Sequence, residues 1–401
     1  MRILISGASI AGPVLAHWLT RRGFDVTVVE RAPALRKTGG HAVDLFRPAM
    51  EISERMGVLP QILSHATGTK RFVLNRAGSR RTTTVDYLKL LGVVSDRHVE
   101  IMRDDLSQIY YDATRDDVEY LFGDEITTID DGDVTFARNS PRSYDVVVGA
   151  DGLHSGVRQL VFGPDAGQSR FLGGCLSVLS VPKTLARDGE MTAILDGGRL
   201  AAIYTADHLD DARAVFLFRP PARVHYDHRD EAAHRALLRS TFSGLAPVVD
   251  EWLTELDGTG PFYFDSITQL ELTSWSRGRV TLVGDAGYCP GPAVGGSTSL
   301  AVLGAYALAG ELGRAGGDYT AAFAAYEKVM TDPVRRSRAF ARTTAKTLFP
   351  SSNLGVWAMI VGAQLISVLP AGLTKAIAKL NANGVRLYDT MSAPDYPLPV
   401  R

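Results

Sequence analysis

Hydrophobic and polar positions at the start of the chain follow the order strand, glycine turn, helix and second strand between Arg2 and Glu30. An apolar run stops at Gly7, an amphipathic helix then ends before Gly23, and Val26–Val29 is predicted to be a buried strand. In a βαβ unit of this kind, backbone N–H groups at the start of the helix can hold a pyrophosphate. The acid after the second strand lies where it can bind both hydroxyls of an adenosine ribose.

The next segments continue as short strands and helices. We expect a strand at Ala42–Phe46, a helix that begins at Pro48, and paired strands at Phe72–Leu74 and Thr82–Val85. A further strand then runs into a helix at Arg103, where a cationic side chain can either pair with a neighbouring acid or reach a bound phosphate.

Short strands with Gly and Asp turns over Val118–Arg138 predict a β-meander, inserted as a crossover between parallel strands. An apolar strand at Tyr144–Val148 follows and ends in the sequence GADGLHSGVR. Asp151 and Gly152 therefore stand at the carboxyl edge of the sheet, where α/β folds bind ligands.

The pattern changes to long alternating runs between Phe171 and about Asp265. Such runs predict an antiparallel sheet with one packed face, partly covered by a helix near His228–Ser240. We interpret this region as a second domain that shapes the substrate site, with pocket walls from Phe171–Phe218 and Phe262–Asp265.

The α/β pattern returns at a buried strand, Val280–Val283, whose end carries Gly284 and Asp285. A loop rich in Pro and Gly follows, and then a long helix from about Ser299, whose N-terminus offers free N–H groups and a positive field. The later apolar stretch Leu354–Leu369 is shorter than the ~20 residues that a membrane span needs, and we expect a helix packed on the body of the protein.

The 401 residues are enough for two to three domains of about 150 residues each. A hydrophobic content of 45% and a net charge of -1 describe an ordinary globular protein, with no electrostatic reason to expect nucleic acid or an anionic membrane as partner. Two cysteines, Cys175 and Cys289, fit a reducing cytoplasm. The N-terminal apolar stretch resembles a signal peptide, but Gly7, Gly12 and Pro13 break it and it continues into the fold pattern, so we expect no secretion signal. No Cys-x-x-Cys or His-Glu-x-x-His spacing predicts a metal site.

Three motifs occur in a fixed order: GASIAGP with Glu30, then GADGLHSGVR, then GDAGYCPGPAVGGS. Together they resemble the three-part signature of class A FAD-dependent aromatic monooxygenases, which share the para-hydroxybenzoate hydroxylase fold. The resemblance covers about residues 1–345. Within this family the sequence GGHAVDL and the apolar C-terminal helices are most similar to tetracycline-inactivating flavin monooxygenases, with polyketide-tailoring hydroxylases as close relatives.

Two positions depart from the family pattern. Ser9 stands where the first motif has its middle glycine, and Tyr288 stands where the family usually has His. Neither position is required for the chemistry, so the departures concern binding details.

The resemblance implies a role for individual residues. Glu30 would bind the ribose, Arg103 the ribityl-phosphate side of the flavin, and Asp285 the ribityl or phosphate oxygens, while Asp44 and Arg36 match residues near the flavin and the nicotinamide cofactor. The predicted cofactor-binding set is Gly7, Ser9, Ile10, Ala11, Gly12, Glu30, Arg31, Arg36, Asp44, Arg103, Asp151, Gly152, Gly284, Asp285, Pro292, Gly295 and Gly296.

The family chemistry implies that NADPH or NADH reduces FAD and that a C4a-hydroperoxyflavin delivers one atom of O₂ to an electron-rich aromatic or polyketide-like substrate, tetracyclines among the candidates. The flavin carries this chemistry, so no catalytic side chain is predicted. A base for a phenolic substrate could be His41, Tyr204, His208 or Arg213, although a structural role is favoured for each. Cys289 is expected to fill space as a small apolar group.

Other functions stay open on the same fold. An FAD-dependent oxidase or dehydrogenase would make peroxide or transfer hydride without inserting oxygen, and a non-enzymatic protein would hold FAD as a structural group or redox sensor. A flavin halogenase would need a Lys soon after the first motif and a Trp-x-Trp-x-Ile-Pro segment, and the chain has neither.

We therefore predict an α/β (α+β) fold with a Rossmann-like FAD-binding domain, an inserted β-meander, an antiparallel-sheet substrate domain and C-terminal helices, in a monomer or homodimer. The expected boundaries are 1–70, 101–170 and 266–345 for the FAD-binding domain, 71–100 for a hairpin of the substrate domain, 171–265 for the rest of that domain, and 346–401 for a C-terminal helical segment.

Overall fold

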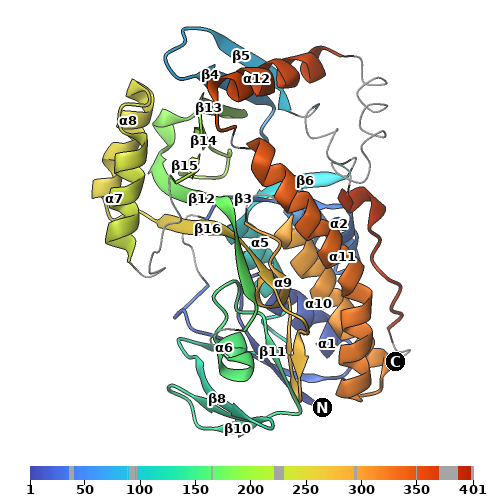
Figure 1. The fold of residues 1–401 in the computed structure, drawn as a ribbon. Coiled ribbons are helices and arrows are strands. Elements are labelled where there is room, and N and C mark those ends of the chain that lie inside the picture. Colours follow the sequence, from blue (N-terminus) through green and yellow to red (C-terminus); the bar gives the residue numbers. More distant parts are fainter. Residues whose placement is uncertain are drawn as a thin grey trace.

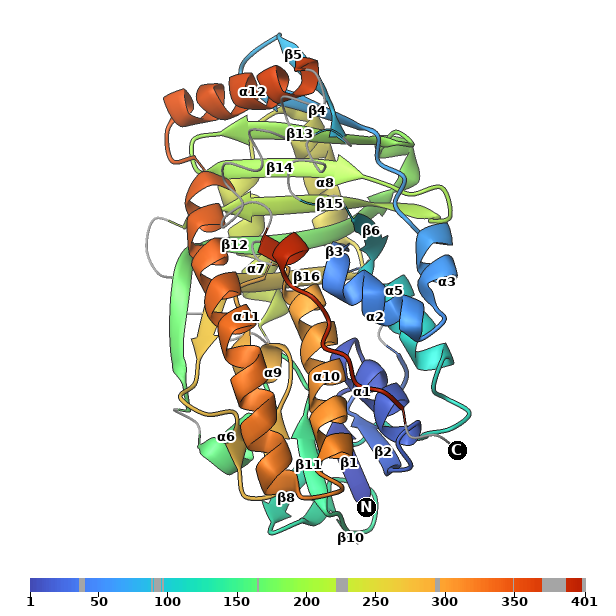
Figure 2. The same ribbon diagram turned by 90° about the vertical axis from the view of Figure 1, so that its right-hand side faces the viewer.

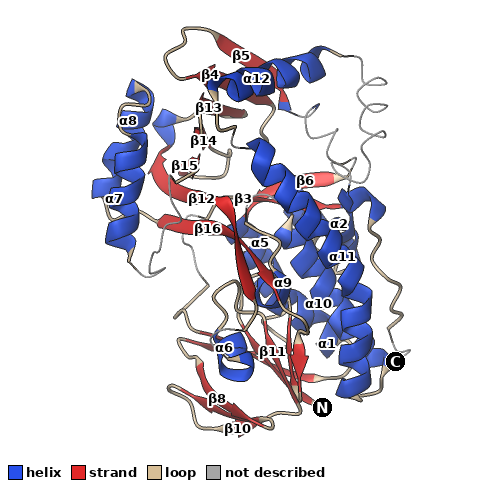
Figure 3. Ribbon diagram, in the orientation of Figure 1, coloured by secondary structure: helices blue, strands red, loops and turns tan. Residues whose placement is uncertain are grey.

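A computed structural model describes residues 1–35, 40–87, 89, 95, 97–163, 166–220, 230–292, 296–348, 350–369 and 387–398. The molecule is elongated, with a helix-rich α/β part at one end and a broad second sheet at the other (Figure 1). Helices and strands alternate in the first part, while strands dominate the second (Figure 3).

The first part is built on a six-stranded sheet in the order β17-β18-β11-β1-β2-β7. All neighbouring pairs are parallel except β17 with β18. The strands are β1 (Arg2–Ser6), β2 (Asp25–Glu30), β7 (Glu119–Phe122), β11 (Val146–Gly149), β17 (Ser276–Arg277) and β18 (Val280–Leu282). Short apolar runs form them because both faces of the sheet are buried.

Helices contribute most of the remaining core of this part. The α1 and α10 helices pack against each other, and α10 is buried along almost its whole length. The helices are α1 (Ala11–Thr20), α2 (Arg47–Arg55), α3 (Leu59–Ser64), α5 (Arg103–Asp112), α6 (Gly156–Phe162), α9 (Asp285–Tyr288), α10 (Ser297–Arg314) and α11 (Tyr319–Leu348).

The predicted meander over 118–138 is wrong in its first strand. The β7 strand pairs in parallel with β2 and extends the main sheet, because its apolar residues Tyr120–Phe122 pack against the central core. The separate antiparallel sheet contains only β8 (Ile126–Asp130), β9 (Asp133–Phe136) and β10 (Arg142–Ser143).

The second part is a seven-stranded sheet in the order β16-β12-β15-β14-β13-β4-β5. It is antiparallel except where β4 pairs in parallel with β13, which places the early hairpin at the far edge. The strands are β4 (Arg71–Arg76), β5 (Thr82–Asp86), β12 (Gln168–Pro182), β13 (Glu190–Asp196), β14 (Arg199–Tyr204), β15 (Asp211–Phe218) and β16 (Phe262–Glu271).

Both faces of this sheet carry a hydrophobic cluster, whereas the alternation predicted one packed face. One face packs against α7 (Glu231–Phe242) and α8 (Pro247–Leu253) through Phe242 and Trp252. On the other face, Ala341 of α11 and Val356 of α12 (Asn353–Val368) join the strands (Figure 2). The predicted helix at 354–369 does pack on the body, but only along one side.

A two-stranded antiparallel ribbon of β3 (Ala42–Phe46) and β6 (His98–Met102) lies between the two parts. Its ends are tied to both: the Ala42 N–H donates to the Tyr204 hydroxyl at 2.6 Å, and the Phe46 N–H donates to Ser299 Oγ at 2.9 Å. Short 3₁₀ turns complete the fold at η1 (Lys183–Leu185), η2 (Thr254–Asp257) and η3 (Leu387–Thr390).

Among the described residues, none of the helices is both long and apolar enough to cross a membrane. Pro370 and Gly384, residue types that predict helix breaks, fall outside the described part of the chain.

Candidate functional site

The turn of the first motif is held by two glycines that cannot carry a side chain. At Gly7, where φ is +109°, an added Cβ would lie 2.5 Å from the Ala150 carbonyl oxygen, and at Gly12 it would lie 1.9 Å from the Gly7 carbonyl oxygen. Ile10 and Ala11 are buried at the start of α1. The backbone N–H groups of this turn therefore lie at a helix N-terminus, at the carboxyl end of β1.

Ser9 occupies the middle position of the motif and keeps its side chain in a polar contact. Arg103 Nη2 donates to Ser9 Oγ at 3.3 Å, and Ser107 Oγ donates to the Ser9 carbonyl oxygen at 3.1 Å. The departure from glycine thus links the first motif to the start of α5, where Arg103 was predicted to face a phosphate.

Glu30 lies at the carboxyl end of β2, beside the same turn. Its carboxylate accepts hydrogen bonds from the Ala8 N–H at 3.1 Å and the Ala32 N–H at 2.9 Å. These two bonds orient a partly exposed carboxylate at the edge of the sheet, where it can accept hydrogen bonds from hydroxyl groups. Arg31 follows it and is exposed.

The second motif holds its acid within its own loop. Asp151 accepts hydrogen bonds from Ser155 Oγ at 2.5 Å and from the Val157 N–H at 3.1 Å, next to the start of α6. Removal from water raises the pKa of Asp151, and these hydrogen bonds oppose the rise. Gly152 has a φ of +82°, which favours glycine in the turn.

Arg158, the last residue of the second motif, was not predicted to have a role. Its buried guanidinium donates to the Leu153 carbonyl oxygen at 2.7 Å and to the Ala286 carbonyl oxygen at 2.8 Å. It therefore ties the second motif to the third, and an Arg that closes a motif was the only sequence signal for it.

The third motif places Gly284 and Asp285 next to the first. Gly284 has a φ of +65°, and an added Cβ would lie 3.5 Å from the Ala11 Cβ and 3.2 Å from the Ala301 Cβ. Removal from water raises the pKa of the Asp285 carboxyl, while its bond to Cys289 and the positive charge of Arg103 act against the rise.

Tyr288, the second departure from the family pattern, is fully buried in the core. Its hydroxyl accepts a hydrogen bond from Tyr326 at 2.9 Å, and a Cβ at Gly304 would lie only 1.8 Å from it. The position therefore packs α9 against α10 and α11.

The N-terminus of α10 begins at Gly296, whose φ is +60°. An added Cβ there would lie 2.7 Å from the Tyr388 ring, which itself stacks on Phe46 with ring centroids 4.9 Å apart. Pro292 lies in the preceding loop and is partly buried. The predicted residues Arg36 and Gly295 lie outside the described part of the chain.

Asp44 lies on the β3–β6 ribbon and pairs with a residue that the sequence analysis missed. His98 Nε2 lies 2.6 Å from Asp44 Oδ1, and the His98 side chain is 8% exposed while that of Asp44 is 44% exposed. Burial lowers the pKa of His98, but the hydrogen bond and charge of Asp44 outweigh it, so the pKa is raised overall. Strand pairing between 42–46 and 98–102 creates this contact.

Glu100, next along the same ribbon, forms a second polar cluster. It accepts hydrogen bonds from Thr67 Oγ1 and from the Tyr87 hydroxyl, the latter at 3.0 Å. Removal from water and the charge of Asp44 raise its pKa.

Three of the four candidate bases contact other residues, and burial keeps the fourth, His41, neutral. Burial lowers the pKa of His41 to about 4, and its carbonyl oxygen accepts the Arg103 N–H at 3.3 Å. The Tyr204 hydroxyl accepts the Ala42 N–H, and the side chains of His208 and Arg213 pair with Asp105 and Asp211, respectively. Burial also raises the pKa of the Cys289 thiol, so it stays neutral.

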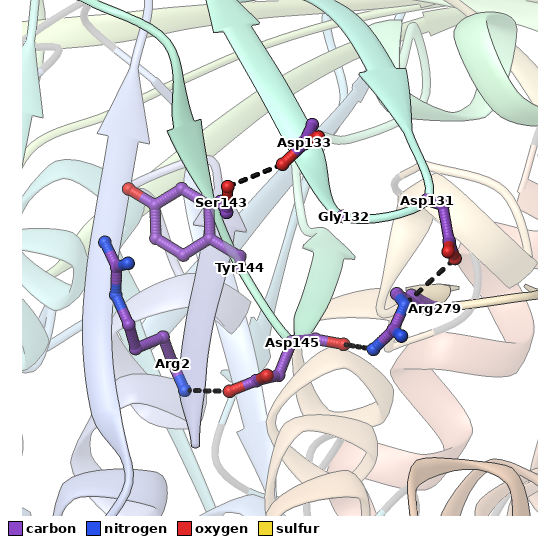
Figure 4. A pocket seen from close by; sticks show the side chains of 8 residues that line it. All are labelled: Arg2, Asp131, Gly132, Asp133, Ser143, Tyr144, Asp145 and Arg279. Carbon is purple, nitrogen blue, oxygen red and sulfur yellow. Dashed lines mark hydrogen bonds and ion pairs between the residues drawn. The ribbon is translucent and has the colours of Figure 1, made fainter.

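A pocket of about 280 Å³ opens at the opposite edge of the main sheet, where β1 begins (Figure 4). Its polar groups contact one another: Arg279 Nε lies 2.9 Å from Asp131 Oδ1, and the Arg2 backbone N–H donates to Asp145 Oδ2 at 2.7 Å. None of the predicted cofactor residues lines it. In the described part of the chain, no group of three or more His, Cys, Asp or Glu side chains could hold a metal ion.

Sequence comparison finds relatives along most of the chain. Residues 1–316 match the family described as "FAD binding domain". A flavin-dependent monooxygenase of Legionella longbeachae serogroup 1 is 36% identical over 346 residues, which are 85% of this chain and 87% of the relative. An uncharacterized protein of Mycobacterium tuberculosis strain H37Rv is 41% identical over 341 residues, which are 84% of this chain and 91% of the relative.

Structural comparison also finds proteins of similar fold. The tetracycline destructase Tet(51) superposes with a TM-score of 0.82 and is 31% identical, covering 98% of this chain and 99% of that chain. Klebsiella pneumoniae HpxO, in complex with FAD and uric acid, has a TM-score of 0.72 at 22% identity and covers 96% of this chain and 97% of that chain, a likeness that shows the fold alone. The predicted α/β fold class is confirmed.

Proposed function

This chain belongs to the FAD-binding family of flavin-dependent monooxygenases, and we propose that within it the protein oxygenates a large, electron-rich polycyclic aromatic substrate with NADPH or NADH as reductant. The predicted class A family and FAD-dependent monooxygenase activity are confirmed by these relatives. The substrate class and the reductant are our inference.

The observation that carries the proposal is the meeting of the three motif loops at one edge of the main sheet. The first loop contacts the second at Gly7 and Ala150, and Arg158 joins the second to the third. The third approaches the first at Gly284 and Ala11. Three sequence-distant loops therefore enclose the N-terminus of α1, the place where an FAD pyrophosphate would lie.

We infer which residues would hold FAD there. Glu30 would accept hydrogen bonds from the ribose hydroxyls, the N–H groups of Ser9–Gly12 would donate to the pyrophosphate, and Arg103 would supply positive charge. The partly buried Asp285 and the N-terminus of α10 at Gly296 would face the flavin end. The turn fits this role, because no side chain caps the start of α1 and the close approach of Gly12 to the Gly7 carbonyl oxygen leaves no room for a side chain there.

FAD, once bound and reduced, supplies the oxygen-transfer chemistry. The chain's own residues have to orient it and keep water out. We propose that His98 is a positioning residue, which holds the Asp44 carboxylate in one orientation beside the cofactor through the 2.6 Å contact.

Two observations support the proposed substrate class: the side chains of the seven-stranded sheet and the similarity to Tet(51). We propose that this seven-stranded sheet forms the substrate domain and that the six-stranded sheet with its helices forms the cofactor domain. One face of this sheet packs against α11 and α12, and it carries large, partly buried side chains, among them Phe72, Met191 and Tyr263. Such side chains suit a large apolar ligand. Tet(51), which is 31% identical, is called a tetracycline destructase.

The test is NADPH and NADH consumption by the purified FAD-loaded protein, with and without tetracyclines and other polycyclic phenols, using isotopically labelled O₂. We expect one compound class to stimulate consumption and to gain a single labelled oxygen. Stimulated consumption that yields only peroxide would favour the oxidase alternative. Stimulation by small monocyclic phenols alone would overturn the proposed substrate class.

A further inference from the structure

The α12 helix presents an unpartnered apolar face. All 16 residues of Asn353–Val368 are uncharged, and one side packs on the seven-stranded sheet through Val356, Met359 and Ile360. The opposite side is open to solvent: Leu354 is 74% exposed, Trp357 56%, Leu365 56% and Val368 71%. The positions 354, 357, 361, 365 and 368 follow the helical period, so these side chains form one continuous stripe.

Positive charge lies at the same end of the molecule as this stripe. The β4–β5 hairpin, residues 71–86, packs against α12 there (Figures 1 and 2) and has four arginines against one acid, although Arg71 pairs with Glu190 at 3.6 Å. Two contacts fix the helix on the hairpin: the Asp86 N–H donates to Ser367 Oγ at 2.9 Å, and Lys89 Nζ donates to the Ser367 carbonyl oxygen at 2.8 Å.

Arg80 and Arg81 at the turn of the hairpin are exposed, and no described residue forms an ion pair with either guanidinium. The overall net charge of -1 averages over the whole chain and conceals this local excess.

We propose that α12 and the β4–β5 hairpin form a docking surface for an anionic lipid membrane, with the stripe at the level of the lipid headgroups and the arginines on lipid phosphates. An exposed Trp within an apolar stripe is typical of the membrane interface, where its ring is half apolar and half polar. Arginines beside the stripe add attraction to anionic lipids. This surface is separate from the cofactor edge and does not depend on the proposed substrate.

A second copy of the chain fits this surface less well. A helix of 16 residues is about 24 Å long and exposes a strip about 10 Å wide, or roughly 240 Å², whereas a stable dimer buries roughly 800 Å² on each partner.

The experiment is co-sedimentation of the full-length FAD-loaded protein with phosphatidylcholine vesicles, either pure or containing phosphatidylglycerol. We expect binding to the anionic vesicles that weakens with added NaCl. Because Trp18, Trp252 and Trp275 are at most 6% exposed, a blue shift of Trp emission and quenching by brominated lipid would report on Trp357.

The variant Leu354→Gln/Leu365→Gln should lower the partition coefficient at least tenfold, and Arg80→Gln/Arg81→Gln should remove the preference for anionic vesicles. Both pairs are exposed, so flavin content and unfolding should not change. The matched control is Leu160→Gln, a Leu that is 44% exposed on α6 at the other end of the molecule. Equal binding by wild-type protein and the Leu354→Gln/Leu365→Gln variant would overturn the proposal, as would a concentration-dependent dimer that this variant abolishes.

Discussion

Gly12 offers the sharpest test of the cofactor turn. A Cβ at this position would lie 1.9 Å from the Gly7 carbonyl oxygen, whereas real Cβ contacts essentially never fall below 3.0 Å. In a Gly12→Ala variant the two groups have to separate by about 1.1 Å. Both groups belong to buried backbone, so no flexible side chain can absorb the shift.

Overpacking of this kind costs about 1–3 kcal/mol, which is roughly a 5- to 150-fold change in an equilibrium constant. If the turn keeps its conformation, the strained contact lowers the free energy of unfolding of the FAD-free protein. If the turn changes its conformation instead, its N–H groups move and FAD affinity falls by a similar factor. Urea denaturation and a fluorescence titration with FAD measure the two quantities separately.

The matched control is Gly362→Ala, because Gly362 lies in α12 with no atom within 4 Å of an added Cβ. Ala is preferred to Gly in a helix by up to about 1 kcal/mol, so this variant should be neutral or slightly more stable. Our reasoning would be refuted if Gly12→Ala matched the wild-type protein in both unfolding free energy and FAD affinity.

Three further predictions concern single side chains. Glu30→Gln keeps the shape of the side chain but removes its charge, and we expect FAD affinity to fall roughly 10- to 100-fold by calorimetry; unchanged affinity would argue against a ribose contact. Tyr288→Phe should lower the free energy of unfolding by about 1 kcal/mol through the lost hydrogen bond from Tyr326 and leave FAD affinity alone; the reverse result would place Tyr288 in the cofactor site. Because the pKa of His98 is raised above 6.5 in the folded protein, the stability that its protonation contributes is fully present below pH 6.5 and is lost as pH rises through the raised value. The gap in unfolding free energy between wild-type and His98→Gln should therefore shrink with rising pH, Asp44→Asn should abolish that trend, and a gap that stays constant with pH would contradict it.

Local patterns in the chain were enough to predict the strands and turns that carry the motifs. Each is encoded within about 15 residues, by an apolar run followed by glycines at tight turns. The strands at 2–6, 25–30, 146–149 and 280–282 lie near their predicted positions, and each ends in the motif or acid expected there. Since all four are parallel in one sheet, their carboxyl ends meet at one edge.

Long-range pairing decided the rest, because no local pattern records which distant segment a residue will face. Strand pairing alone brings His98 to Asp44, 54 residues away in the chain, and it joins β4 to β13 in parallel. Ser9 and Tyr288 both depart from a family pattern in the sequence. In the structure, Ser9 contacts Arg103, whereas Tyr288 is buried in the core. The apolar composition of α12 is likewise plain in the sequence, but only its packing shows that one side stays exposed. Sequence thus determined which local elements form, and tertiary structure determined which of their side chains meet and which remain open to a partner.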